Sequence, residues 1–395
     1  MSFASSNRAA LRGTPETVFG VTDATPVFER FRYNSESLNY NISNIVSEEI
    51  RDDRMTSDLI QVSADASGDV AFELSYGAYD QYLEAMFAQS SGFSAAQNIA
   101  AVDVSALDDG GFQAYASVGE TLTVFPVGVW VAVGGFVDPT LNGFFRVKTS
   151  TAGQLTMYRS FIAAEAAGAA VTLDNSGSIK NGVDLMSFTI QKFLQDATTP
   201  TYFNFEGVRA GSMSLDFATA QILQGTFGFM GLRQVTSTSE IAGQTVTDLF
   251  TNTPMNAVSN VLDILVDNAI STANFQSLTL EMNNNLRAQD GIGSLGHLGI
   301  ALSRLELSGS VGLYFEDSSM YDLYLNGTGF ALSFRVKDVQ NNHYIFTLPN
   351  VKFESGTVVS GGLDQDVILD ATWRAIMDPA TQSMISIDRF EAINL

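Results

Sequence analysis

The residues best suited to catalysis or ligand binding show few of the spacings that such chemistry requires. Residues 291–296 have the sequence GIGSLG and match G-x-G-x-x-G, which in a dinucleotide site follows a strand and opens a helix within a βαβ unit. Here the neighbouring pattern predicts strands on both sides, so a flexible loop is favoured. No cofactor is expected.

Metal ligands and activated nucleophiles are equally sparse. His297 and His343 are the only histidines, and the chain has no cysteine. Neither histidine has a neighbouring Glu or His at the spacing of a metal site or a triad, and Asp364 and Asp366 lack the Gly and Glu spacing of a calcium loop. We therefore expect no metal, no catalytic site and no enzyme activity.

The charge balance argues against nucleic-acid and membrane binding. The 395 residues include 20 Lys and Arg against 43 Asp and Glu, a formal charge of −23, and such a surface repels phosphate groups. The longest apolar run, 124–137, is too short and too broken by glycine to span a membrane. With 45% apolar and only 16% charged residues, the chain is expected to fold and to stay in solution.

The elements that carry these residues are organised by an internal repeat. SLNYNISN at 37–44 is echoed by SLTLEMNN at 277–284, SGDV at 67–70 by SGSV at 308–311, and YDQYL at 79–83 by YDLYL at 321–325, with offsets of 240 to 242. Three blocks in the same order predict two copies of one domain. Residues 186–188 and 226–227 match 332–334 and 372–373 at the smaller offset of 146, so the first copy holds an insertion.

The repeat divides the chain into five parts. They are an N-terminal arm at 1–24, a discontinuous first domain at 25–92 and 180–234, an inserted β domain at 93–179, a linker at 235–256, and a second domain at 257–395. Because the insertion has no counterpart in the second copy, we expect it to have its own core. Its Trp130 is expected in that core, and the insertion is expected to be dispensable for assembly.

Alternating apolar and polar residues predict that the fold is mainly β. Leu38, Tyr40 and Ile42 alternate with polar residues, and the same period marks further strands at 69–75, 186–190, 213–217, 278–282, 311–315, 332–336, 344–348 and 367–373, with a last strand around Ile385. Residues 79–87 change to helical spacing, as does the counterpart at 321–325. The polar segment 46–67 predicts a projecting loop. The spacing of apolar residues in 258–266 suits a helix as well as a strand, and because the repeat equates this segment with 28–33, it is assigned as strand.

The chain resembles the major tail tube proteins of long-tailed bacteriophages. The similarity is carried by ETVFG at 16–20, SEEIR at 47–51, ELS at 73–75, NNLR at 284–287 followed by GIG, LP at 348–349 and DQDV at 364–367. It implies two fused tube domains of packed β-sheets, each with a helix, and an inserted all-β domain. It further implies that three chains form a pseudo-hexameric ring, and that stacked rings form the tail tube.

The resemblance also implies partners and a location. The chain would bind itself, tail tip, tape measure and tail terminator proteins, would lie in the virion tail after assembly in the host cytoplasm, and would let DNA pass without specific binding or membrane contact. Two other classes stay open: a virion adhesin or carbohydrate-binding β protein acting through the insertion, and a β-rich enzyme, for which the residues offer least support.

Two sets of residues are candidates for assembly roles. The mixed charges after the first strand suit contact with the next ring, namely Glu48, Glu49, Arg51, Asp52, Asp53 and Arg54. The polar sides of the repeated strands suit an acidic inner surface, which would repel DNA phosphates, and they hold Asn39, Asn41, Asp69, Glu73, Thr279 and Glu281.

Overall fold

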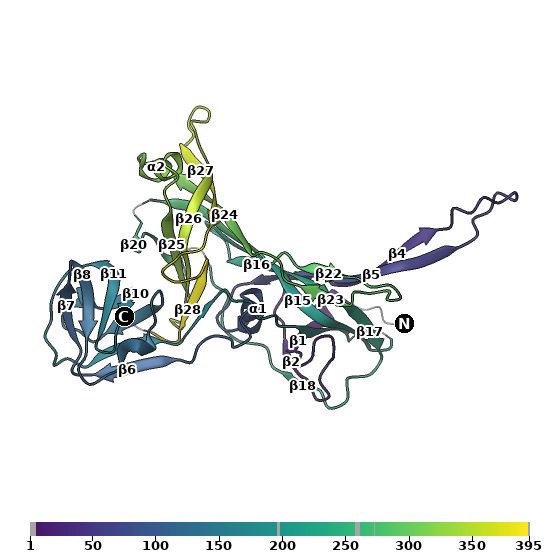
Figure 1. Ribbon diagram of the computed structural model, residues 1–395, viewed down its shortest axis with the longest axis horizontal. Helices are drawn as coiled ribbons and strands as arrows, with labels where there is room; N and C mark the ends of the chain where they lie inside the picture. Colours follow the sequence, from purple (N-terminus) through teal and green to yellow (C-terminus); the bar gives the residue numbers. More distant parts are fainter. Residues whose placement is uncertain (1–4, 196–197, 257–260, 272, 394–395) are drawn as a thin grey trace.

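The computed structural model describes residues 5–195, 198–256, 261–271 and 273–393. The chain is mainly β, as the sequence predicts. Figure 1 shows a central body and an upper lobe, an inserted lobe on the left, and a long hairpin that projects to the right. Residues 1–4 of the expected arm and Val258 of the expected strand lie outside the described residues.

A four-stranded ladder forms the centre of each half of the chain, with the same order in both. In the first half the order is β4 (Asn39–Val46), β5 (Leu59–Glu73), β16 (Gln224–Gly231) and β15 (Thr201–Ala218). In the second half it is β21 (Phe275–Asn283), β24 (Glu306–Tyr314), β27 (Ile368–Ala375) and β26 (His343–Val359). The matching order supports the internal repeat.

A second layer in each half extends from the first part of the longest strand. The first part of β15 pairs with β14 (Phe188–Leu194) on one edge and β17 (Arg233–Ser237) on the other, and β14 pairs with β1 (Ala9–Pro15). The first part of β26 likewise lies between β25 (Phe330–Lys337) and β28 (Ser386–Phe390), and β25 pairs with β19 (Val261–Val266).

This arrangement corrects the sequence comparison at the start of each copy. The repeat equates residues 258–266 with 28–33, but β19 occupies the place in its layer that β1 occupies in the other. Part of the expected arm is therefore the first strand of the first domain. Its residues Leu11, Arg12 and Thr14 are all buried, so both faces of β1 are covered and the strand lacks the alternation that reveals a half-buried strand.

Helices follow β5 and β24 where the apolar spacing predicts them. In α1 (Asp80–Met86), Tyr82, Leu83 and Met86 are buried, and Tyr82 packs on Phe31 and Phe188 with ring centroids 4.5 and 5.2 Å away. The second helix, α2 (Ser319–Leu325), has no buried residue and lies over β26. The equivalent helices thus differ: α1 belongs to the core, whereas α2 packs on the core with side chains that are only partly buried.

The insertion forms its own sheet and core. Its seven strands follow the order β6 (Gln97–Ala101), β12 (Val171–Asn175), β9 (Trp130–Gly134), β10 (Gly143–Ser150), β11 (Gln154–Ser160), β8 (Phe112–Ala116) and β7 (Ser105–Asp109). Tyr115, Phe125 and Phe145 lie in a separate apolar cluster. Asp138 accepts a hydrogen bond from the amide of Thr140, which caps a short 3-10 helix, η3 (Pro139–Leu141).

The insertion also packs on the second tube domain. Trp130 is buried, but against Ile345 and Phe390 of the other domain, and its indole N–H donates to the Thr347 hydroxyl at 2.8 Å. The chain then leaves the insertion through β13 (Gly177–Lys180), which pairs with β28. The insertion therefore connects the two halves of the molecule through a shared apolar contact as well as through the chain.

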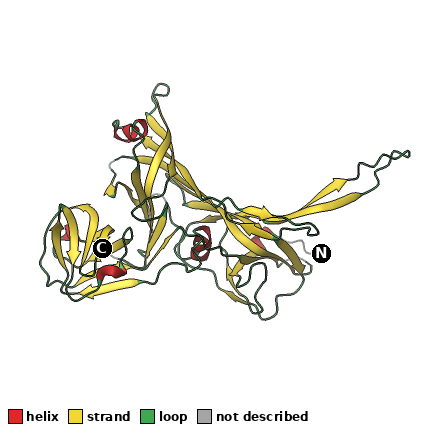
Figure 2. Cartoon of the chain, in the orientation of Figure 1, coloured by secondary structure: helices red, strands yellow, loops and turns green. Residues whose placement is uncertain are grey.

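The remaining elements are short and lie in the connections between the longer strands. They are η1 (Ser6–Arg8), β2 (Val27–Arg30), β3 (Ser35–Glu36), η2 (Leu122–Val124), β18 (Thr245–Thr247), β20 (Ala269–Ile270), β22 (Arg287–Gln289) and β23 (Gly299–Ala301). Strands account for nearly all regular structure (Figure 2).

Candidate assembly surfaces

The two ladders join edge to edge inside the chain. The second part of β15 pairs with β21 from Ser212 opposite Asn283 to Ala218 opposite Ser277. The strand order β4-β5-β16-β15-β21-β24-β27-β26 is therefore continuous across both tube domains. The last strand of the first ladder thus pairs with the first strand of the second ladder.

One face of this joined sheet is apolar and the other is polar. Residues such as Phe72, Phe227, Leu280 and Trp373 alternate inward into a common core. The intervening residues on the other face are mostly Ser, Thr, Asn, Asp and Glu. A hydroxyl pair links two of its strands, with Thr279 Oγ1 and Ser310 Oγ 2.9 Å apart.

All six predicted inner-surface residues lie on this polar face. Asn39, Asn41, Asp69 and Glu281 are exposed, and Glu73 and Thr279 are half-buried. Glu281 lies opposite Ser214 and Ser308, which places it near the centre of the joined sheet. The structure thus brings together residues that are up to 242 positions apart (39 and 281).

Further charged residues share the polar face. Sequence analysis did not find them, because it considered one strand at a time. The strand registers are needed to show that these residues lie on the same face. The additional acidic residues are Asp216, Glu306, Glu354 and Asp370, and the basic ones are Lys352 and Arg374. Arg374 is paired with Glu354, so the face is predominantly acidic.

The joined sheet ends in two open edges. Within the described ranges, β4 pairs only with β5, and residues 355–359 of β26 pair only with β27. Each leaves a row of backbone amide and carbonyl groups without a strand partner. Open edges of this kind are templates for a strand from another chain.

The β4–β5 hairpin projects from the first domain (Figure 1). The sequence predicts a projecting loop over 46–67, whereas the structure shows two extended strands joined by a shorter loop, 47–58. All six residues predicted to contact the next ring lie in that loop and are exposed. Arg51 binds both carboxylate oxygens of Asp53, and this hydrogen bonding lowers the pKa of Asp53.

The shaft of the hairpin is apolar and exposed. Ile45 lies opposite Ile60, and Val46 lies opposite Leu59, with exposures of 58, 53, 50 and 59% respectively. A run of exposed large apolar side chains on a projecting hairpin is typical of a contact surface. Sequence analysis did not single out these residues because it assigned most of them to the polar loop expected over 46–67.

The corresponding loop of the second copy folds back instead of projecting. Residues 284–305 include β22 and β23, and the Ala64 amide donates to the Leu295 carbonyl at 2.8 Å. His297 contacts Asp290 and Asp65 at 2.6 and 3.1 Å. Burial acts to lower the pKa of His297, but its hydrogen bonds to the two carboxylates outweigh burial and raise it.

The residues considered above for cofactor or metal binding do not form such a site within the described part of the chain. The 291–296 segment is a loop between two strands, as predicted. Within the part of the chain that the structure describes, no three His, Asp or Glu side chains gather as a metal site. No described helix is both long and apolar enough to cross a membrane.

Comparison with known proteins identifies one family. A family model described as phage tail tube protein matches residues 6–375. No curated protein matches the chain.

Proposed function

The chain belongs to the phage tail tube protein family, and from this we propose that three copies form a ring with pseudo-sixfold symmetry and that stacked rings form the conduit for DNA ejection. Membership makes the protein a structural component of the virion tail. The three-chain ring, the stacking and the passage of DNA are the finer parts of the proposal.

The internal β15–β21 junction carries this proposal. It joins the last strand of one ladder, β15, to the first strand of an equivalent ladder, β21. The two open edges of the joined sheet are of the same two kinds, because β26 is a last strand and β4 is a first strand. A second chain repeats the junction if its β4 pairs with the first chain's β26. Repetition around an axis then gives a closed ring in which each chain contributes two tube domains.

The register of the chain-to-chain junction follows from the internal one. The repeat aligns Ser67 with Ser308, and the strands opposite them then make Asn41 equivalent to Asn283. On the other side of the same two residues, the registers make Ser355 equivalent to Ser212. Because Ser212 lies opposite Asn283 inside the chain, Ser355 of one chain would lie opposite Asn41 of its neighbour.

The polar face would then line the inside of the ring. Each chain carries a formal charge of −23, and the carboxylates on this face would repel phosphate groups within a Debye length of about 8 to 10 Å. A surface that holds no phosphate lets DNA slide. The exposed hairpin, with its charged tip and apolar shaft, would reach the next ring, and tail tip, tape measure and terminator proteins would contact the ends of the tube.

Engineered disulfides test the ring directly, because the chain has no cysteine of its own. Opposed strand residues lie close enough for a disulfide. After assembly and oxidation, Asn41→Cys with Ser355→Cys should give a covalent ladder that ends at three chains, and electron microscopy should show stacked rings.

Two controls define the result. Ser214→Cys with Glu281→Cys should form its bond within one chain, whether or not the protein assembles. Ser37→Cys with Ser355→Cys displaces the partners by four residues, about 13 Å, and should give no ladder. A ladder that ends at six chains would contradict the three-chain ring.

A further inference from the structure

A cavity lies where the insertion meets both tube domains. Its volume is about 350 Å³, within the range of about 300 to 1,000 Å³ that is usual for small-molecule sites. It is lined by residues 126–129 and 146 of the insertion, by residues 89, 91–95 and 178–180 of the connecting segments, and by residues 381, 383 and 386 before and at the start of β28. Strand β28, which borders it, lies on the other side of the central body from the projecting hairpin (Figure 1).

A buried cation faces this cavity without a carboxylate at salt-bridge distance among the described residues. Arg146 is only 5% exposed; its Nε donates to the Gly128 carbonyl and its Nη1 to the Asn268 side chain, both at 3.1 Å. Burial lowers its pKa, and no ion pair to Arg146 occurs among the described residues. An unpaired buried guanidinium is costly, so an anion here would be stabilising.

The free nitrogen of this guanidinium lies beside Thr381. A Cβ built on Gly128 would lie 2.6 Å from Thr381 Cγ2 and 3.8 Å from Arg146 Nη2, so both side chains border the same point. Gly128 has a φ of +91°, a conformation that favours glycine. The glycine therefore allows the insertion loop to approach Thr381 and leaves Arg146 Nη2 open to the cavity.

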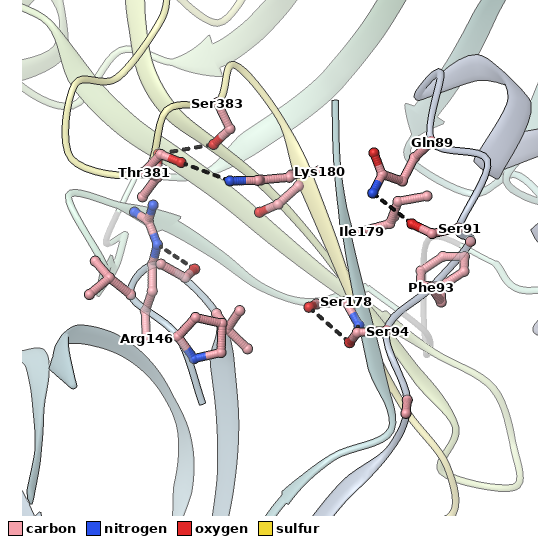
Figure 3. A pocket seen from close by; sticks show the side chains of 17 residues that line it. Gln89, Ser91, Phe93, Ser94, Arg146, Ser178, Ile179, Lys180, Thr381 and Ser383 are labelled. Carbon is pink, nitrogen blue, oxygen red and sulfur yellow. Dashed lines mark hydrogen bonds between the residues drawn. The ribbon is translucent and has the colours of Figure 1, made fainter. Parts of the chain in front are cut away.

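A second cation reaches the same place from another element. Lys180, at the end of β13, is exposed and lies with its Nζ 3.5 Å from the Thr381 carbonyl. Figure 3 shows both cationic groups pointing toward Thr381. Hydroxyl and amide side chains also line the cavity, including Ser91, Ser383 and Gln89, and the lining contains no carboxylate.

Two nearby acidic residues, Asp378 and Asp388, form no ion pair with Arg146 or Lys180 among the described residues. Asp378 accepts hydrogen bonds from the Thr381 amide and hydroxyl at 2.9 and 2.7 Å. Asp388 is fully buried, and burial raises its pKa to about 8, so it is mostly protonated at pH 7. The chain has more than twice as many acidic as basic residues. Two converging cations without an ion-pair partner therefore make this cavity locally positive on an otherwise negative molecule.

We propose that this cavity binds a small anion carried on a polyol, such as an acidic sugar or a glycerol phosphate, with its carboxylate or phosphate held between Arg146 and Lys180. The hydroxyl and amide groups of the wall bind the polyol. The site is independent of the ring contacts, and it gives the insertion a ligand-binding role on the tube.

Isothermal titration of the purified protein tests the proposal with sodium glucuronate, sn-glycerol 3-phosphate and inorganic phosphate, and with glucose as the neutral probe. We expect saturable binding of at least one organic anion at about millimolar affinity, no binding of glucose, and weakening as salt rises. Binding of glucuronate alone indicates an acidic sugar, and binding of glycerol phosphate indicates a phosphate ester.

Lys180→Gln removes the exposed cation without disturbing a buried group and should weaken binding about tenfold. Lys352→Gln, on the polar face of the joined sheet, is the matched control and should bind normally. Absence of anion binding, equal binding of glucose, or unchanged binding by Lys180→Gln overturns the proposal. So does a Lys180→Gln variant that binds normally but fails to form tubes, because the cation then serves a contact between chains.

Discussion

The carboxyl group of Asp388 is buried between the insertion and the second tube domain. Asn175 Nδ2 donates to its Oδ1 at 3.1 Å, while its Oδ2 has no partner among the described groups. Burial raises the pKa to about 8, although the hydrogen bonds and Arg146 act in the opposite direction. The folded protein therefore keeps a proton that the unfolded chain loses near pH 4.

This pKa difference predicts a pH-dependent stability. The contribution of Asp388 is fully present below the unfolded pKa of 3.8 and is lost as pH rises toward 8. Asp388→Asn cannot ionise and keeps the acceptor for Asn175. The difference in melting temperature between this variant and the native protein should grow in favour of the variant from pH 5 to pH 8, as measured by calorimetry. A difference that is constant with pH would contradict a buried, protonated Asp388.

The carboxylates of the polar face predict an effect on DNA passage. Glu281→Lys with Glu73→Lys places cations where the proposed inner surface is acidic, and each phosphate that they bind adds a salt-dependent hold on DNA. Tubes should still assemble, but genome ejection should slow, most at low salt, as followed by fluorescence of released DNA. The neutral control, Glu281→Gln with Glu73→Gln, should eject normally. Normal ejection by the lysine variant would mean that this face does not line the channel.

At the scale of the element, the hairpin combines two kinds of contact. Reversing the charge with Arg51→Glu and Arg54→Glu should block stacking and leave the protomer folded, since both residues are exposed. Because Arg51 is already paired with Asp53 inside the loop, we expect Arg54 to account for more of the effect. Electron microscopy of each single variant measures this. Normal tubes from the double variant would remove the loop from the stacking contact.

The apolar shaft of the hairpin is tested separately. Ile45→Ser with Ile60→Ser removes an exposed cross-strand pair, so the melting temperature of the protomer should change little. If the shaft is covered on assembly, each lost side chain should cost about 1.5 to 3 kcal/mol of contact energy, and tubes should be short or absent. Full-length tubes would show that the shaft stays in solvent.

The elements also show what sequence periodicity can and cannot reveal. The stripe from Tyr79 to Phe87 predicted α1 because one face of that helix is buried. Strand β1 was missed because both of its faces are covered. The joining of β15 to β21 was missed as well, since backbone pairing between strands leaves no periodic signal in either segment.

Long-range packing explains the other gaps in the prediction. Trp130 was correctly expected to be buried, but its partner Thr347 is 217 residues away, and nothing in the local sequence indicates that contact. The six inner-surface candidates share one face, as the strand period implied, whereas the further carboxylates on that face could be found only from the registers between strands.

At the scale of the molecule, the insertion is less separable than the repeat suggests. Joining Ser91 to Gly182 removes β13 from its pairing with β28 and uncovers Ile345 and Phe390. We therefore expect the deletion variant to melt at a lower temperature and to aggregate, although the insertion has a core of its own. Light scattering and calorimetry measure both effects.

A point substitution distinguishes the shared contact from the missing strand. Trp130→Ala should cost about 3 to 5 kcal/mol, since the indole is buried at the contact and donates a hydrogen bond to Thr347. Phe125→Ala, in the insertion's own core, is the matched control and should destabilise the insertion alone. A deletion variant as stable as the native chain would show that the insertion only decorates the tube.

The β15–β21 junction also has a kinetic consequence. Inside one chain the two ladders meet at a high effective concentration, so that junction forms in a first-order step that dilution does not slow. In the proposed ring every second junction is of this kind, and the equilibrium concentration of rings depends on the third power of free protein rather than the sixth. Ring nucleation would therefore tolerate a lower supply of protein in the cell than an equivalent ring of six separate subunits.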